Sequence, residues 1–199
     1  MLIGLEVDVR GLSVDRIQEG LVDEAYDWRV VNLRVAYVSA GLLIAACTGE
    51  LQDQGRVVRI YDGDSLIVQM GDGREVEVRL FGIDAPERRQ PWSRRSRQAL
   101  SGLVRDRQVR LAPVTQDSYG RTVAVMYTLP DGLDVNREMI RQGNAWVYRR
   151  YTRDTDLIAL ETAAREARLG LWALPEAERV PPWQWRSQNR RGGRSENGD

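Results

Sequence analysis

The chain lacks histidine and lysine: its 199 residues include 29 basic side chains, and every one of them is arginine. Without histidine, a Ser-His-Asp triad and histidine-ligated metal sites are excluded. Without lysine, Schiff-base chemistry and a Walker-type phosphate-binding lysine are excluded as well. A catalytic site in this chain must therefore be built from carboxylates, arginine, tyrosine, hydroxyl groups or a metal ion.

The chain also has only one cysteine and no net charge. Cys47 is the single cysteine, which excludes an intrachain disulfide bond and a zinc site made of several cysteines. The 29 acidic residues balance the 29 arginines, so the overall charge does not indicate a nucleic-acid partner. A content of 42% hydrophobic and 29% charged residues is typical of a globular protein, and the length suits one domain with appendages.

Residues 1–28 are acidic, with seven acids against two arginines, and show no motif. Signal peptides begin near basic residues, yet this acidic segment precedes the next basic ones. We therefore expect translation to start at Val30 or Val31, because valine codons can serve as initiators in bacteria. Residues 1–28 would then be an uncertain extension from a mis-assigned start.

Residues 29–47 resemble the signal peptide of a bacterial lipoprotein. Arg29 and Arg34 precede the uncharged run 35–46, which is shorter than the roughly 20 residues of a membrane-spanning helix but suits a signal peptide. The run ends at Cys47, as in a lipobox, which predicts a lipid anchor there. We expect a protein in the cell envelope or outside the cell, lipid-anchored to a bacterial membrane or, alternatively, secreted. The other interpretation is a buried helix or strand whose cysteine fills space.

Hydrophobic periodicity predicts a globular domain over residues 55–175, after a tether at 48–54. Period-two alternation and glycine-containing turns predict five strands, and spacings of three and four residues predict three helices. The expected fold is α+β, a five-stranded OB-fold barrel packed with three α-helices. Residues 176–199 are rich in Trp, Arg and Gly and predict a flexible tail that could add weak contacts to single-stranded nucleic acid. The predicted strands are 56–61, 65–70, 74–80, 108–111 and 122–127, and the predicted helices are 92–103, 135–142 and 155–168.

Three acids and one arginine stand at the ends of strand-like runs: Asp64, Arg79, Asp84 and Glu87. Singly, each could decorate a turn or a strand surface. Carboxylates that converge on one site repel each other, and burial increases the repulsion, so a cation or shared protons must stabilise them. The pattern therefore indicates a site for a metal ion and a phosphate.

Five segments in order resemble the thermonuclease, or staphylococcal nuclease-like, family. The resemblance covers roughly residues 55–172 and implies an OB-fold barrel that carries a calcium-dependent phosphodiesterase acting on DNA and RNA. An Asp-Gly-Asp turn alone would be a weak signal, but five segments in the same order are specific. The segments are 58–66, 78–87, 117–121, 135–136 together with 140–143, and 170–172.

The resemblance assigns the acids to metal and water. Asp64 and Asp84 match the calcium-binding aspartates, and oxygen atoms are the ligands that Ca²⁺ takes. Ala85 stands where the family often has threonine, and its backbone carbonyl is the implied ligand, which does not need the hydroxyl. Glu87 matches the acid that activates or positions the attacking water.

The resemblance assigns the arginines and tyrosines to the substrate. Arg79 and Arg121 match the two phosphate-binding arginines, whose planar guanidinium groups suit a phosphate. Tyr119 and Tyr151 match tyrosines near the nucleotide. Arg149 stands where the family's best-known member has a further tyrosine, so substrate preference is not predicted.

The combined prediction is a monomeric hydrolase, an endonuclease of the thermonuclease type that uses Ca²⁺ and water to cleave DNA and/or RNA. The alternative is a catalytically silent module that binds nucleic acid or protein in the cell envelope. A structural envelope lipoprotein is a third possibility. None of the expected acids and arginines is missing, which favours the enzyme.

Overall fold

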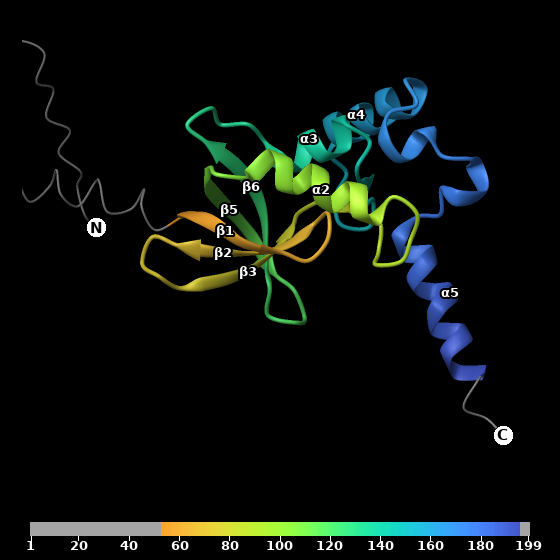
Figure 1. Cartoon of the computed structure of the whole chain (residues 1–199), viewed down its shortest axis with the longest axis horizontal. Helices are drawn as coiled ribbons and strands as arrows, with labels where there is room; N and C mark the ends of the chain where they lie inside the picture. Colours follow the sequence, from red (N-terminus) through yellow and green to blue (C-terminus); the bar gives the residue numbers. More distant parts are fainter. Residues whose placement is uncertain (1–52, 196–199) are drawn as a thin grey trace, which may run out of the picture. The chain divides into compact units, whose positions relative to one another are not determined.

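Five strands form a closed barrel in this computed structural model, which describes residues 53–195 (Figure 1). The order around the barrel is β1-β2-β3-β6-β5, and β5 pairs with β1 to close it. β3 and β6 pair in parallel, and the other neighbours are antiparallel. The predicted α+β fold with a five-stranded barrel is confirmed. The strands are β1 (Gln54–Ile60), β2 (Ser65–Met70), β3 (Glu75–Leu80), β5 (Gln108–Gln116) and β6 (Thr122–Leu129).

Aliphatic side chains from alternate strand positions fill the inside of the barrel. Leu66 and Val68 of β2 are buried, as are Val78 and Leu80 of β3. This follows from the strand geometry, in which successive side chains point to opposite faces. Burying each such side chain contributes about 1.5–3 kcal/mol, so the alternating sequence itself sets the register.

Three helices complete the core: α2 (Ser93–Val104), α3 (Val135–Arg141) and α4 (Thr155–Glu166). Leu100 of α2 and Leu157 of α4 are buried in the same hydrophobic cluster as the barrel residues. All three helices lie where the apolar spacing predicted them.

Asn136 ties α3 to the barrel near the ends of two strands. Its side-chain oxygen accepts a hydrogen bond from the Met126 N–H at 3.1 Å. Its amide nitrogen donates to the carbonyl oxygens of Phe81 and Ala124, at 2.9 and 3.2 Å. A buried amide with these partners fixes the backbone just beyond β3, in the segment that leads to Asp84.

A small second sheet holds the segment that follows β3. Strand β4 (Ile83–Asp84) pairs antiparallel with β7 (Trp146–Val147). Both strands have only two residues, too short for a periodic pattern, and the sequence did not predict them. Their pairing fixes the backbone of Asp84 against residues that follow α3.

The C-terminal segment differs from its prediction as a flexible tail. After two short 3-10 helices, η2 (Gly170–Ala173) and η3 (Glu176–Glu178), helix α5 spans Pro182–Ser195. Trp183 at its start stacks on Tyr148 with ring centroids 5.5 Å apart, and meets the edge of Trp146 at 5.9 Å. Composition indicated flexibility, but these aromatic contacts anchor the beginning of the helix.

Candidate active site

A cleft of about 650 Å³ is lined by residues from the end of β3, the loop between β5 and β6, and α5. Arg79, Glu87 and Arg121, the predicted catalytic residues, all line it. Tyr119 and Tyr151, predicted to contact the nucleotide, line it too. The fold therefore gathers around one cleft residues that are widely separated in the sequence.

Arg79 links the cleft to two buried aspartates. Its Nη1 lies 3.3 Å from Asp64 Oδ1, and its Nη2 lies 2.7 Å from Asp84 Oδ1. The Arg79 side chain is 19% exposed, whereas the side chains of Asp64 and Asp84 are 3% and 1% exposed. One guanidinium group thus holds both carboxylates and still reaches the cleft.

The Asp-Gly-Asp turn that carries Asp64 is packed tightly against α2. Asp62 Oδ1 accepts a hydrogen bond from the Asp64 N–H at 3.0 Å. A Cβ atom at Gly63 would lie 1.9 Å from Ser96 Oγ, so the close approach of turn and helix requires glycine. The Asp64 carbonyl also accepts a hydrogen bond from the Leu80 N–H at 2.8 Å. The backbone of Asp64 is therefore fixed before any ligand binds.

Burial is the largest influence on the pKa of both aspartates. It raises the pKa of Asp64 to about 6, although Arg79 and hydrogen bonds from Ala85 and Ser65 oppose it. Burial also raises the pKa of Asp84, against the hydrogen bond from Arg186. The nearby Asp64 charge raises the pKa of Asp84 further. The two carboxylates thus sit where a cation would stabilise their ionised forms.

This carboxylate pair fits a calcium ion by the chemistry of its donors. Carboxylate and carbonyl oxygens are the ligands that Ca²⁺ prefers. Within residues 53–195, no three acidic or cysteine side chains are grouped to hold a metal, so Asp64 and Asp84 would need other oxygen donors. At Ala85, the N–H donates to Asp64 Oδ2 at 2.7 Å, while the predicted carbonyl ligand remains a prediction.

Glu87 meets an arginine that the sequence did not assign to the site. Arg186 of α5 donates from Nη1 to a carboxylate oxygen of Glu87. It also grips Asp84, with Nη2 2.8 Å from Oδ2 and Nη1 3.1 Å from Oδ1. Burial lowers the pKa of Arg186, but the contacts with Asp84 and Glu87 outweigh it and raise the pKa above its ordinary value. In the sequence, the only hint was an arginine beside Trp183 and Trp185.

Arg121 reaches the cleft from the loop between β5 and β6. Its Nε and Nη2 lie 2.8 and 2.7 Å from Asp117 Oδ2. Asp117 Oδ1 accepts hydrogen bonds from the N–H groups of Tyr119 and Arg121. Tyr119 is 84% exposed, and Arg121 lies over its ring, 5.5 Å from the centroid. Asp117 therefore orders the loop and aims Arg121, while Tyr119 offers a free aromatic face.

Tyr148 and Tyr151 lie next to each other in the cleft lining. Tyr151 is 61% exposed, and its ring meets Tyr148 edge-on at 4.9 Å. Tyr148, which the sequence analysis did not single out, lines the cleft. Arg149 pairs with buried Glu161 at 2.9 Å and does not line the cleft. Cys47, the predicted lipidation site, lies outside the described residues.

Comparison with known proteins gives a consistent result. The staphylococcal nuclease homologue family matches residues 77–174, which include Arg79, Asp84, Glu87 and Arg121 but not Asp64. An uncharacterized endonuclease of Escherichia coli is 43% identical over 132 residues, 66% of this chain and 84% of the relative. Protein ParB of Escherichia coli is 41% identical over 167 residues, 78% of this chain and 93% of the relative. The micrococcal nuclease of Shigella flexneri is 38% identical over 160 residues, 76% of this chain and 90% of the relative. This chain therefore belongs to the staphylococcal nuclease family.

Proposed function

We propose that this protein is a calcium-dependent endonuclease that hydrolyses phosphodiester bonds in DNA and/or RNA by attack of water. The observation that carries the proposal is the cleft itself. Two arginines and one glutamate, Arg79, Arg121 and Glu87, line it next to a buried aspartate pair. Family membership and relatives named as endonuclease and micrococcal nuclease support the same class of reaction.

The arginines would bind the scissile phosphate. Arg121 is aimed by Asp117 and presents a planar fork of N–H donors, which matches the geometry of phosphate oxygens. Arg79 is already held by ion pairs with Asp64 and Asp84, so its side chain loses little conformational freedom when a phosphate binds. Both groups stabilise the negative charge that develops on phosphorus-bound oxygens.

Glu87 would accept the proton of the attacking water. Its side chain is 32% exposed, so it is accessible to solvent in the cleft, unlike Asp64 and Asp84. Ca²⁺ held by Asp64, Asp84 and the Ala85 carbonyl would supply positive charge beside the phosphate. Tyr119 and Tyr151 expose aromatic rings on which bases can stack.

We also propose that the protein is a monomer attached to the cell envelope by lipid on Cys47, with secretion as the alternative. The support for the lipid anchor is the sequence of residues 29–47. Within the described residues, no helix is both long enough and apolar enough to cross a membrane. Mass spectrometry of the protein from a bacterial membrane fraction tests the anchor, and an unmodified Cys47 in that fraction would contradict it.

Cleavage of single-stranded DNA and of RNA by the purified chain, with Ca²⁺ or with a chelator, tests the proposed function. We expect cleavage with Ca²⁺ and loss of cleavage in the chelator, because the two buried carboxylates need a cation beside the phosphate. Restoring excess Ca²⁺ should restore the rate. Equal cleavage in both conditions would contradict the metal requirement. No cleavage in either, with binding retained, would favour the silent binding module.

A further inference from the structure

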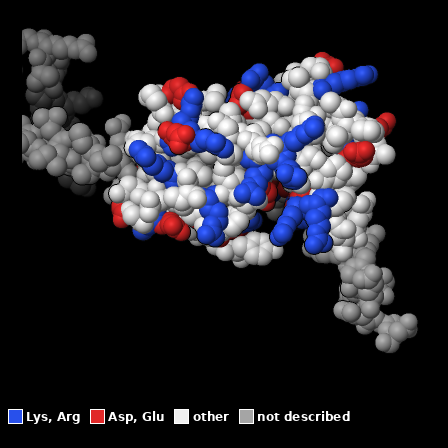
Figure 2. Space-filling model, in the orientation of Figure 1, with Lys and Arg blue, Asp and Glu red and all other residues white. Residues whose placement is uncertain are grey.

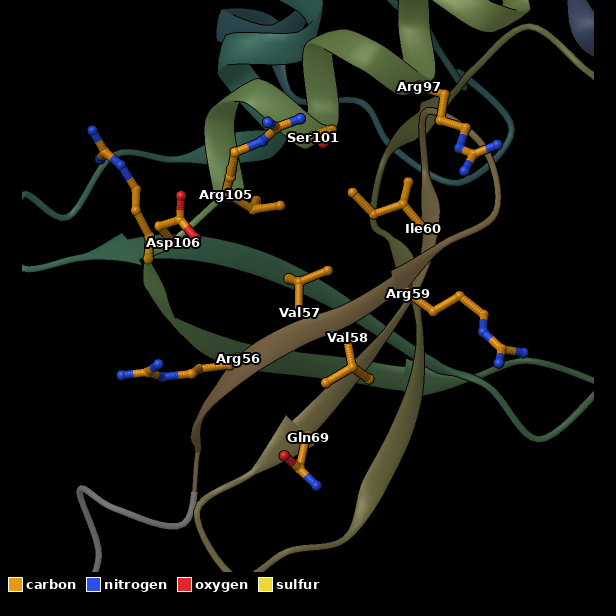
Figure 3. A pocket seen from close by; sticks show the side chains of 12 residues that line it. Arg56, Val57, Val58, Arg59, Ile60, Gln69, Arg97, Ser101, Arg105 and Asp106 are labelled. Atoms are coloured by element: carbon orange, nitrogen blue, oxygen red, sulfur yellow. The ribbon is translucent and has the colours of Figure 1, made fainter.

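A second hollow, which we call the β1–α2 groove, is lined by arginines from two elements (Figure 3). Its volume is about 500 Å³, and it shares no lining residue with the active-site cleft. Arg56 and Arg59 come from β1, and Arg97 and Arg105 come from α2 and its C-terminal cap. Figure 3 shows these arginines on the two sides of the hollow.

The groove carries more positive than negative charge from the described residues that line it. Within residues 53–195, none of these four arginines has an ion-pair partner. A fifth, Arg107, pairs with Asp131, and Asp106 is the one acid that lines the groove. Like charges around a hollow repel each other and focus a positive potential into it. An anion in the groove would offset this electrostatic repulsion between the arginines.

The arrangement suits an extended polyanion better than a single small anion. A neighbouring hollow, lined by Arg94, Arg97, Gln98 and Ser101, shares Arg97 and Ser101 with the groove and extends the basic surface along α2. Figure 2 shows arginine side chains gathered on this face of the molecule. Guanidinium groups bind phosphate oxygens through paired hydrogen bonds, and a row of them matches the regular charges of a nucleic-acid backbone.

We propose that the β1–α2 groove binds the sugar-phosphate backbone of a nucleic-acid substrate outside the segment that enters the cleft. The proposal rests on the proposed nuclease function. Strand β1 connects the two places, because Ile60 lines the groove and Asp62, just beyond the strand, lines the cleft. A substrate strand that leaves the cleft along β1 therefore meets the arginines of the groove.

Binding of long and short oligonucleotides to the full chain tests this proposal. The variant is Arg97→Gln with Arg105→Gln, and the matched control is Arg153→Gln with Arg168→Gln, two exposed arginines without ion-pair partners in the described part of the chain. Affinity for fluorescent single-stranded DNA is measured in chelator at several salt concentrations. The logarithm of the binding constant falls as the logarithm of the salt concentration rises. We expect the groove variant to reduce the magnitude of this negative slope by about 1–2 for the long oligonucleotide. A short oligonucleotide that fills only the cleft should bind both variants like the parent.

Each outcome decides the question. An unchanged slope for the groove variant, or an equal fall in the control, would overturn the proposal. The single variants repeat the test if the double variant fails to fold. Vesicles with anionic lipids form another arm, because loss of vesicle binding with nucleic-acid binding intact would mean that the groove faces a membrane. Cleavage of the short oligonucleotide with Ca²⁺ is measured in a separate assay. If the protein does not cleave, the binding data still test the groove.

A separate set of contacts carries a second inference, about Arg186. This guanidinium donates to both carboxylate oxygens of Asp84, at 2.8 and 3.1 Å, and to Glu87. Its helix is anchored by Trp183, which stacks on Tyr148. Arg79 already binds Asp84 Oδ1 at 2.7 Å, so both oxygens of Asp84 are engaged by arginine. A metal ion approaching Asp84 must compete with these contacts.

We infer that Arg186 is a positioning residue: it holds Asp84 and Glu87 in place and gives way when Ca²⁺ binds. Calorimetry of Ca²⁺ binding without substrate tests this in the full chain. We expect Arg186→Gln to bind Ca²⁺ about 5-fold or more tightly, the range of a typical coupling between two ligands. Arg186→Lys, which keeps the charge but loses the fork, should lie between Arg186→Gln and the parent.

Hydrogen exchange supplies a readout that does not depend on activity. Adding Ca²⁺ to the parent should speed exchange of the α5 amides, because Arg186 loses its hydrogen bonds to Asp84 and Glu87. Arg153→Gln removes the same charge elsewhere on the surface and should leave Ca²⁺ affinity unchanged. Equal or weaker Ca²⁺ binding by Arg186→Gln, or α5 exchange that ignores Ca²⁺, would overturn the inference.

Discussion

Glu87→Gln is expected to lower kcat by about 10²- to 10⁴-fold, equivalent to about 2.7–5.4 kcal/mol of barrier. Glutamine keeps the shape of the side chain and an oxygen that can accept the Arg186 hydrogen bond, but it cannot take a proton from water. Binding of nucleic acid should therefore change little. Single-turnover cleavage with Ca²⁺ and fluorescence anisotropy in chelator measure the two effects separately.

Glu166→Gln is the matched control for this substitution. Glu166 is exposed at the end of α4 and does not line the cleft, so its loss of charge should leave turnover unchanged. A Glu87→Gln protein that cleaves like the parent would contradict the assigned role. A large fall in affinity with kcat unchanged would instead assign Glu87 to ground-state binding.

Arg121→Ala should lower kcat by about 10²- to 10³-fold, the usual loss when one preorganised donor to transition-state charge is removed. Arg121→Lys should recover only part of this, because an ammonium group cannot form the paired contacts of a guanidinium fork. Asp117→Asn keeps the arginine but weakens the contacts that aim it, and should cost less than Arg121→Ala. Steady-state kinetics with Ca²⁺ provide the measurement.

Measurements of folding on the Asp117 and Arg121 variants distinguish a loss of catalysis from a loss of structure. The Arg121 side chain is 21% exposed in a surface loop, so circular dichroism and thermal unfolding should resemble those of the parent. If Arg121→Lys retained the full kcat, paired contacts with the phosphate would not be needed. If Arg121→Ala raised KM alone, Arg121 would bind the ground state and the transition state equally.

The barrel strands could be predicted because their burial follows period two. Val76, Val78 and Leu80 of β3 alternate with charged residues, and Val78 and Leu80 are buried. Strand β5 continues to Gln116, whereas the predicted strand ended at residue 111, because Pro113 interrupts the alternating pattern. The pairing of β5 with β6 shifts register between Pro113 and Thr115. Irregular pairing of this kind depends on the neighbouring strand, which no local pattern records.

The site was predictable where local motifs carry it. Asp64 follows a glycine turn, and Asp84 follows a barrel strand, so both could be singled out from nearby residues. Arg186 could not be found in this way, because it is one of several arginines in a segment with little apolar content. Its place depends on Trp183 meeting Tyr148, a tertiary contact that overrides local composition.

The closed barrel also sets the moment at which a newly made chain can become active. β3 pairs with β6 and β1 pairs with β5, so the barrel cannot close before Leu129 has left the ribosome. Closure through distant pairings is slow compared with local folding. Until then the chain carries Asp64 and Asp84 without the structure that brings Arg121 to the same cleft as Arg79 and Glu87. On the proposed route to the cell envelope, a chain kept unfolded before export would spare the nucleic acids of the cell that makes it.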